Sequence, residues 1–463
     1  MPNHQSKYHT LRQSYPEFVY EGFTVQELPE GIMAEYRFSC GEASTFRPTV
    51  LFKRNFPLQK LSDATRNLLI FHIGMVECIS YWKAFCSPII VVKPFRFCTE
   101  QELWWKKLFR HGLGEFFYTN GIAIPGEEIF TFKYPDSAQT FEPVDLPMPT
   151  EGVIVPVGGG KDSVVTLEIL LRSNFDVLPV VMNQRDATRE VLKVAGFDDT
   201  NTFEINRTID PLLLQLNKEG FLNGHTPFSA LLAFHTSMVA ALVGRQHIAL
   251  SNEWSANEAT IPGTLINHQY SKSLEFESDF RDYINKYMVR EINYFSMMRP
   301  INELQIGKLF AQFDAYHSVF KSCNVGSKTD IWCCECSKCL FTWIVLSPFL
   351  NVDALVAIFG KNLWDNPQLI ETLQQLCGLS ETKPFECVGT IDEVNAALNY
   401  TLSQYSEMQL PVLLDWYAKN GRALDSSGEL QHHLETFHQP NFLNAPFEAV
   451  LKSFLFPAKA QPN

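Results

Sequence analysis

The spacing of apolar residues changes near residue 150. From there on, short apolar runs at residues 153–157, 177–183, 202–206 and 247–252 have the length of buried strands. The segments between them, residues 163–172, 187–195, 211–219 and 228–244, have helical spacing. Strands that alternate with helices predict an α/β domain with a parallel sheet, right-handed crossovers and helices on both faces. Ligands of such sheets bind at the carboxyl ends of the strands.

The first 150 residues have a different pattern and no nucleotide-binding motif. Residues 33–38 alternate as a strand, and residues 68–85 predict a buried helix or helix pair. Residues 100–109 predict an amphipathic helix with Thr99 as its N-cap. We interpret residues 1–150 as an N-terminal α+β domain. Four prolines between residues 134 and 151 predict a linker into the α/β domain, which we assign to residues 151–320.

The end of the α/β domain has weaker signals, since residues 256–272 are typical of a loop and helical spacing returns from Ser273. The remaining third of the chain divides into two parts. A cysteine-rich knuckle occupies residues 321–345. Residues 346–463 predict a helical C-terminal region, with helices at 411–420, where Pro411 stands in the first turn, and at 429–437.

Composition narrows the class of protein. The chain has 463 residues, 46% of them apolar, and a formal net charge of −13. A chain this acidic lacks the basic face that nucleic-acid binding needs, and an anionic substrate would need a locally basic pocket. The first residues contain no hydrophobic signal segment, and the longest apolar stretch, residues 228–243, is too short and too polar to span a membrane. We therefore expect a cytoplasmic protein that acts on a small molecule, with neither nucleic acid nor membrane as a partner.

One stretch combines a strand, three glycines and the start of a helix. Residues 153–163 read Val-Ile-Val-Pro-Val-Gly-Gly-Gly-Lys-Asp-Ser. Glycines permit positive φ and let a phosphate approach the backbone N–H groups, next to the positive end of the helix dipole. Asp162 after Lys161 excludes a Walker loop, and Ser163 stands where a dinucleotide fingerprint needs its third glycine. A glycine-rich turn without a ligand is the alternative.

This loop resembles the PP-loop of ATP pyrophosphatases, Ser-Gly-Gly-x-Asp-Ser, with Gly158 in place of the usual serine. The resemblance implies a PP-loop (adenine nucleotide alpha hydrolase-like) fold that cuts ATP between its α and β phosphates and transfers AMP to a substrate oxygen. Lys161 would be a point charge on the phosphates, and Mg²⁺ would bridge the phosphates and Asp162. The implied ATP-binding residues are Gly158, Gly159, Gly160, Lys161, Asp162, Ser163 and, near adenine and ribose, Met182 and Asn183. A capping or turn role is the alternative for Met182 and Asn183.

Five of the eleven cysteines lie between residues 323 and 339. Cys323, Cys333, Cys336 and Cys339 have the spacing C-x9-C-x2-C-x2-C, which lets four thiolates converge on one ion. Four thiolates are typical of a closed structural Zn²⁺ site. Cys334 is the spare, because adjacent cysteines do not easily both point inward. An iron–sulfur or redox role and unmetallated thiols are the alternatives.

Five segments carry a wider resemblance: PVGGGKDS at 156–163, SNEWSAN at 251–257, CECSKCLF at 334–341, KPFECVGT at 383–390 and ISYWKA at 79–84. They are similar to the MurL family of UDP-N-acetylmuramoyl-L-alanyl-L-glutamate epimerases. The resemblance implies a role in peptidoglycan precursor synthesis. The terminal L-Glu of UDP-MurNAc-L-Ala-L-Glu would be inverted to D-Glu, with ATP converted to AMP and pyrophosphate.

The implied chemistry is sound on physical grounds. Adenylation removes the negative charge of the substrate carboxylate, so its α-proton becomes acidic enough for a base to take. The candidates for proton transfer are Glu253, His268, Glu386 and Cys387, each of which also has a purely structural alternative. Two other functions stay open. One is a PP-loop enzyme that adenylates a deazapurine or an RNA, and the other is a non-catalytic ATP-binding subunit.

Overall fold

The computed structural model describes residues 3–457 apart from 43, 54–56, 406–408 and 423–425. One mixed sheet of eleven strands runs through the molecule, in the order β11-β10-β7-β8-β9-β4-β2-β1-β5-β6, with β3 beside β2. The strands are β1 (Glu17–Leu28), β2 (Gly31–Cys40), β3 (Ser44–Phe46), β4 (Thr49–Lys53), β5 (Ile89–Val92), β6 (Thr131–Lys133), β7 (Thr150–Pro156), β8 (Val177–Met182), β9 (Phe203–Arg207), β10 (Arg245–Leu250) and β11 (Asn293–Ser296).

The half of the sheet from β11 to β9 is entirely parallel. It confirms the four predicted strands and adds β11, a strand of four residues that was too short to show a period. The chain order reverses between β7 and β10, which makes their carboxyl ends the topological switch point where doubly wound sheets bind ligands. Strand β4 pairs antiparallel with β9, so the same sheet continues into the first 150 residues.

Helices cover both faces of the parallel half, as predicted. They are α5 (Lys161–Arg172), α6 (Asp186–Val194), α7 (Pro211–Lys218), α8 (Phe228–Val243), α9 (Leu274–Tyr287) and α10 (Glu303–Phe310). The side chains of β7 alternate between the two cores: Ile154 packs into the core that includes α8, whereas Val153 and Val155 pack into the core that includes α5 and α10. A strand buried on both faces is a continuous apolar run, which is the pattern seen in the sequence.

The N-terminal part adds α1 (Gln5–Ser14), α2 (Asp63–Trp82), α3 (Thr99–Gly112) and α4 (Gly114–Thr119). The predicted strand at 33–38 lies within β2, and the predicted buried helix is α2. Thr99 is not the N-cap of α3. Cys98 holds that position, because its backbone is extended and its N–H donates to the Gln101 side chain at 3.1 Å.

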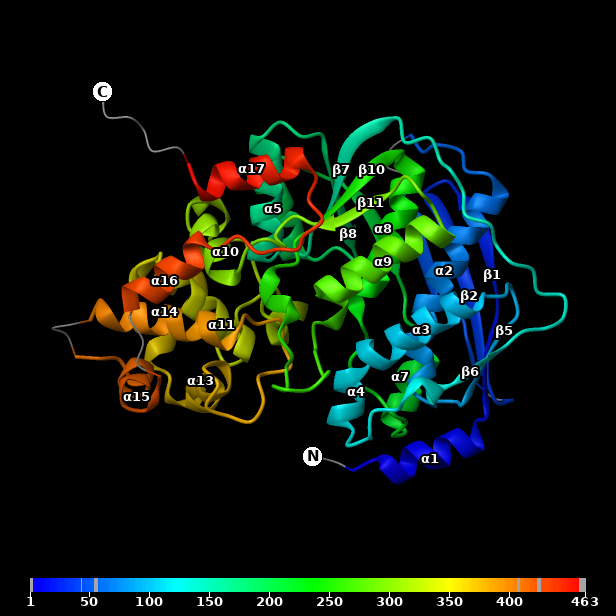
Figure 1. Cartoon of the computed structure of the whole chain (residues 1–463), viewed down its shortest axis with the longest axis horizontal. Helices are drawn as coiled ribbons and strands as arrows, with labels where there is room; N and C mark the ends of the chain where they lie inside the picture. The colour runs from blue at the N-terminus through cyan, green and yellow to red at the C-terminus, as the bar shows by residue number, and fades with distance from the viewer. Residues whose placement is uncertain (1–2, 43, 54–56, 406–408, 423–425, 458–463) are drawn as a thin grey trace.

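The C-terminal helices gather at the end of the molecule away from β1 and β2 (Figure 1). They are α11 (Ser337–Leu346), α12 (Val352–Phe359), α13 (Ile370–Leu376), α14 (Ile391–Ser403), α15 (Val412–Asn420) and α16 (Ser426–Glu435), followed by α17 (Ala445–Leu455), which returns to pack on α5. Pro411 is the extended N-cap of α15 and not its first helical residue. No helix in the described part of the chain is long and apolar enough to cross a membrane.

Candidate active site at the switch point of the sheet

Two adjoining cavities lie at the carboxyl ends of β7, β8 and β10. They have volumes of about 270 and 300 Å³ and share Gly158, Arg185 and Phe228 in their linings. The first cavity also contains Ser251 and Asn252, at the exit of β10. The site therefore lies where the topology of the sheet predicts a ligand.

The glycine loop forms one wall of both cavities. A Cβ at Gly158 would meet no atom within 4 Å, whereas one at Gly159 would lie 3.2 Å from the Thr188 backbone. Gly159 also has a φ of +86°, which disfavours side chains. Gly160 is the N-cap of α5, and a Cβ there would lie 2.8 Å from Ser322 Oγ. The loop needs its second and third glycines for conformation and for the close approach of the segment before Cys323.

Lys161, Asp162, Glu253 and Glu303 form a charged cluster, in which Asp162 is partly exposed and lines the first cavity while the other three are buried. The Lys161 side chain is 1% exposed and forms ion pairs with Asp162 and Glu303, so it does not line the cavity. Carboxylate oxygens of Asp162, Glu253 and Glu303 lie within 4.8 Å of one another. Glu303, which the sequence did not single out, reaches this cluster from the first turn of α10.

Burial and mutual repulsion perturb these carboxyl groups. Burial, together with the negative charges of Asp162 and Glu253, raises the pKa of Glu303 to about 8 despite the nearby Lys161. Burial also raises the pKa of Glu253. For Asp162 burial acts in the same direction, but Lys161, Lys338 and Lys272 together outweigh it and lower the pKa. The cluster holds more carboxyl groups than Lys161 alone can keep ionised.

Four cationic side chains line the first cavity, although the chain as a whole is acidic. They are Arg185, Lys272, Lys321 and Lys338. The backbone N–H of Lys321 donates to Gly159 O at 3.0 Å, which fixes this segment on the glycine loop. Ser163 lines the same cavity, and its hydroxyl donates to Gly160 O at 2.9 Å. The cavity therefore suits a polyanion such as a nucleotide triphosphate.

The 383–390 loop brings Cys387 into this cavity. Lys383 fixes the loop from inside, donating to Gly389 O at 2.8 Å and pairing with Glu258. Lys272 Nζ lies 3.2 Å from Cys387 Sγ. The neighbouring Glu386 is not part of the cavity lining. Its carboxylate accepts a hydrogen bond from Asn324, and burial raises its pKa.

Met182 and Asn183 line the second cavity, as expected for the exit of the second strand of this sheet. Asn183 has a φ of +51°, and its side chain makes two hydrogen bonds, of 2.7 and 2.9 Å, with the backbone of Arg207. The Arg207 guanidinium lines the cavity and forms an ion pair of 2.6 Å with the fully buried Glu77 of α2. Asn183 thus shapes the cavity by joining β8 to β9, the turn role that the sequence left as an alternative.

The four predicted cysteines converge. The Sγ atoms of Cys323, Cys333, Cys336 and Cys339 all lie within 4.8 Å of one another, with the Cys336–Cys339 pair at 3.5 Å. Cys334 points away and donates to Phe359 O at 3.2 Å, which confirms it as the spare. A Cβ at Gly326 would lie 2.1 Å from Ile331 O, so this turn requires glycine.

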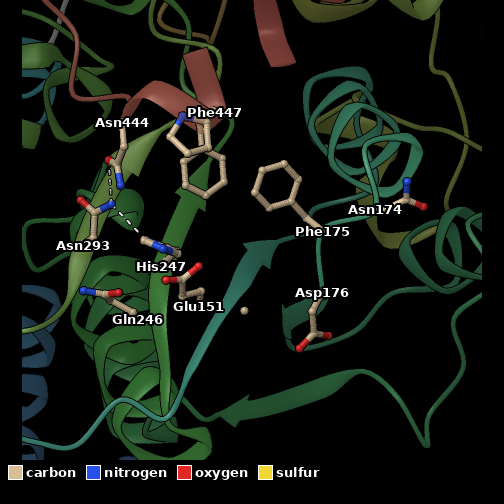
Figure 2. A pocket seen from close by; sticks show the side chains of 11 residues that line it. Glu151, Asn174, Phe175, Asp176, Gln246, His247, Asn293, Asn444 and Phe447 are labelled. Carbon is tan, nitrogen blue, oxygen red and sulfur yellow. Dashed lines mark hydrogen bonds between the residues drawn. The ribbon is translucent and has the colours of Figure 1, made fainter. Parts of the chain in front are cut away.

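A larger cavity of about 580 Å³ lies at the opposite, amino ends of β7 and β10 (Figure 2). Three of its polar side chains pair with one another, since Asn293 Nδ2 lies 3.1 Å from both His247 Nδ1 and Asn444 Oδ1. Glu151 and Asp176 line it, and none of its described lining residues is lysine or arginine. It is unsuited to a nucleotide, and the smaller cavities at the switch point are the better candidate site.

Several site residues had no assigned role in the sequence. Lys338 lies inside the 334–341 segment, so that motif could have indicated it. Glu303 follows β11, and missing that short strand concealed it. Arg185 and Arg207 follow predicted strands, but an arginine at a strand exit is not a specific signal. The N-terminal segment 79–84 helps to position Arg207 of the second cavity, since Ser80 accepts a hydrogen bond of 3.2 Å from the Arg207 side chain.

Comparisons with known proteins agree with this architecture. Residues 9–297 match the family model of the MurL N-terminal domain, and residues 317–430 match that of the MurL C-terminal domain. A UDP-N-acetyl-alpha-D-muramoyl-L-alanyl-L-glutamate epimerase from Xanthomonas oryzae pv. oryzae is 33% identical over 334 residues, which cover 70% of this chain and 72% of that protein. Epimerases of the same name from Salinispora tropica and Micromonospora sp. are each 31% identical, the latter over 89% of this chain and 91% of its own length. The chain therefore belongs to the MurL family.

Proposed function

We propose that this protein inverts the terminal L-Glu of UDP-MurNAc-L-Ala-L-Glu to D-Glu in peptidoglycan precursor synthesis, after activating its carboxylate with ATP. Membership of the MurL family and the names of three relatives support the epimerisation. The observation that carries the adenylation step is a single cavity lined by the glycine loop, four cations and the Cys387 thiol. We place the reaction in the cytoplasm, where ATP is supplied.

The PP-loop resemblance and the cavity together define the first step. A carboxylate oxygen of the substrate attacks the α-phosphate of ATP, and pyrophosphate leaves. Arg185, Lys272 and Lys338 face the space where the phosphates would lie and would offset their negative charge. Lys161 acts from beneath the loop, where it keeps Asp162 ionised. Met182 and Arg207 line the second cavity, which would hold the adenosine.

The carboxyl cluster fits a magnesium ion. Asp162, Glu253 and Glu303 converge, and burial raises the pKa values of the two glutamic acids, which supports a position that a cation would stabilise. Magnesium prefers one or two carboxylates plus phosphate oxygens, which this position beside the loop allows. Bound Mg²⁺ would neutralise charge on the phosphates. In this proposal Glu253 binds metal and does not transfer protons.

The four cysteines fit a structural zinc ion. Four sulfurs placed about 2.3 Å from a tetrahedral zinc lie about 3.8 Å apart. The Sγ–Sγ distances of 3.8 Å for Cys323–Cys336 and 3.7 Å for Cys333–Cys339 agree with this value. Bound zinc would hold Ser322 and Lys321 against the glycine loop, so its contribution is to folding and to the shape of the ATP site.

Cys387 is the best placed of the proton-transfer candidates. It lines the cavity, whereas Glu253 is only 2% exposed and Glu386 is bonded to Asn324. In the second step Cys387 takes the α-proton of the acyl adenylate, and the resulting enolate takes a proton on its opposite face. Water then hydrolyses the inverted adenylate and AMP leaves.

Incubation of the purified protein with ATP, Mg²⁺ and UDP-MurNAc-L-Ala-L-Glu tests this proposal. We expect pyrophosphate and AMP to form only with this acceptor, and not with UDP-MurNAc-L-Ala, and chiral analysis to find D-Glu. Asp162→Asn should lower AMP formation by about 100-fold or more. Asp176→Asn, at the opposite end of the sheet, should leave it unchanged. Failure of UDP-MurNAc-L-Ala-L-Glu to trigger pyrophosphate release would refute the proposal. Release with a deazapurine or an RNA would instead favour an enzyme that adenylates one of those substrates.

A further inference from the structure

Side chains from four distant segments form a continuous chain of contacts at the edge of the cavity. Glu115, in α4, accepts a hydrogen bond from His268 Nδ1. The His268 imidazole also interacts with the thiol of Cys387, since each shifts the pKa of the other. His225 lies on the other side of the carboxylate, with Nδ1 3.3 Å from Glu115 Oε2 and its ring centroid 4.6 Å from that of His268. Carboxylate, imidazole and thiol are thus joined in the order used by enzymes that activate a cysteine.

The two histidines carry different charges. Burial opposes protonation of His268, but the thiol of Cys387 and the carboxylate of Glu115 outweigh it and raise its pKa to about 9. For His225 burial and the neighbouring charge of His268 lower the pKa to about 4. At neutral pH an imidazolium therefore faces Cys387. Lys83, from the 79–84 segment, holds the loop that carries His225 by donating to Gly224 O and to Thr226 Oγ1.

The charges around Cys387 favour its thiolate. Burial would raise the pKa of this thiol, but Lys272, His268 and Lys338 outweigh it and lower the pKa to about 5. Lys338 Nζ also donates to the Cys387 carbonyl, which holds this cation beside the thiol. The chain offers an internal comparison: burial without such cations raises the pKa of Cys78.

We propose that Glu115 and His268 are positioning residues that hold Cys387 as a thiolate, and that this thiolate takes the α-proton of the adenylated glutamate. This inference rests on the proposed adenylation. The C–H bond breaks, an S–H bond forms, and the electron pair moves into the acyl carbonyl to give an enolate. The enolate takes a solvent proton on its opposite face, and the Cys387 proton returns to solvent, so that protons and charge balance over one turnover.

Direct measurement of Cys387 reactivity is the first test. The purified full chain is treated with iodoacetamide over pH 4 to 9, and alkylation of each cysteine is followed by peptide mass spectrometry, with the exposed Cys98 as internal reference. We expect the rate at Cys387 to reach half its maximum near pH 5, and at a higher pH in His268→Gln and Glu115→Gln. Glu115→Asp should restore part of the shift. If the alkylation rate of wild-type Cys387 reached half its maximum only near pH 8.5, as for an ordinary thiol, this result on the wild type alone would overturn the proposal.

A second measurement separates this inference from the adenylation on which it rests. Exchange of labelled pyrophosphate into ATP reports adenylation whether or not a proton moves. We expect Cys387→Ala to keep this exchange within a few-fold of wild type and to lose D-Glu formation by about 100-fold or more, and Cys98→Ser to change neither. Absence of exchange in the wild type would instead refute the proposed adenylation.

Three other outcomes would overturn the inference. D-Glu formation by Cys387→Ala at the wild-type rate would show that another group takes the proton. A thioester found on Cys387 during turnover would make the thiolate a nucleophile. A second zinc equivalent that is lost in His268→Gln would make Glu115, His225 and His268 a metal site.

Discussion

Replacing one cysteine of the 323–339 cluster should release the proposed zinc ion and disorder the wall of the proposed ATP site. The variant is Cys336→Ser. All the Sγ–Sγ separations lie within 4.8 Å and three of them are 3.5 to 3.8 Å, where tetrahedral zinc requires about 3.8 Å. Structural zinc contributes about 10–16 kcal/mol in small domains, as much as the whole net stability of about 5–15 kcal/mol of a typical protein. Loss of one ligand is therefore expected to unfold the cluster and not merely to loosen it.

The effect should reach the nucleotide although the cysteines are not proposed to bind it. Ser322 Oγ lies beside Gly160, and the Lys321 N–H donates to Gly159 O, so the segment that leads into Cys323 forms part of the cavity wall. We expect Cys336→Ser to lose both zinc and the rise in melting temperature that ATP gives the wild type. A ligand at 100 times its Kd stabilises by about 2.7 kcal/mol, which is a measurable shift.

Cys334→Ser is the matched control. Cys334 is also buried and belongs to the same segment, but its thiol donates to Phe359 O and does not face the other four sulfurs. A serine hydroxyl can make the same hydrogen bond, so this variant should keep its zinc and lose at most about 1 kcal/mol. Elemental analysis per chain and thermal unfolding with and without ATP measure both variants. Equal zinc content and equal melting temperature in Cys336→Ser and the wild type would refute the reasoning.

Three further predictions concern the loop, the carboxyl cluster and the core. Gly159→Ala should lower the melting temperature, because its φ of +86° costs a side chain about 1–2 kcal/mol, whereas Gly158→Ala should change it little; thermal unfolding of the pair decides this. Glu303→Gln should raise the Mg²⁺ concentration for half-maximal AMP formation by about 10-fold, and an unchanged titration would remove Glu303 from the metal site. Burial lowers the pKa of His72 from 6.5 to about 4. The pKa of His72 is lower in the folded state than in the unfolded state, so protonation favours unfolding. The contribution of neutral His72 to the free energy of unfolding is therefore complete above pH 6.5, and about 3 kcal/mol of it is lost as the pH falls to 4. Denaturant unfolding of His72→Gln at pH 7 and 4.5 should show a smaller loss than the wild type.

The parallel half of the sheet could be predicted because its signals are local. Each of β7, β8 and β10 contains an apolar run buried on both faces, β9 alternates apolar and polar residues, and the helices between the strands have an apolar stripe. Strand β11 was not predicted, because its four residues are too few to show a period of apolar positions. The pairing of β4 with β9 was equally out of reach, since it joins residues more than 150 positions apart through backbone hydrogen bonds that leave no mark on side-chain spacing.

Local motifs also indicated the position of the candidate site, but not the distant residues that shift the pKa values of its side chains. The glycine loop and the cysteine cluster are contiguous in sequence, because tight turns and closely spaced ligands require particular residues within a few positions. The contacts that shift pKa values are not contiguous: Glu303 reaches Lys161, and Glu115 reaches His268, across more than 140 residues. Nothing in the sequence around Glu115 distinguishes it from a glutamate on the solvent face of a short helix.

Lys161 shows the limit of a motif most clearly. A lysine directly after three glycines predicts that its ammonium contacts the phosphates. In the structure Lys161 is the first residue of α5, and its side chain runs beneath the loop to Glu303, at the start of α10. The direction of the side chain depends on a carboxylate supplied by another helix, because a buried ammonium must have a charged partner. In the proposed site the charge for the phosphates would come from Lys272 and Lys338, which lie far from the loop in sequence and line the same cavity. A motif therefore defines the backbone that receives a ligand, whereas the charges that meet the ligand are set by the packing of distant elements around it.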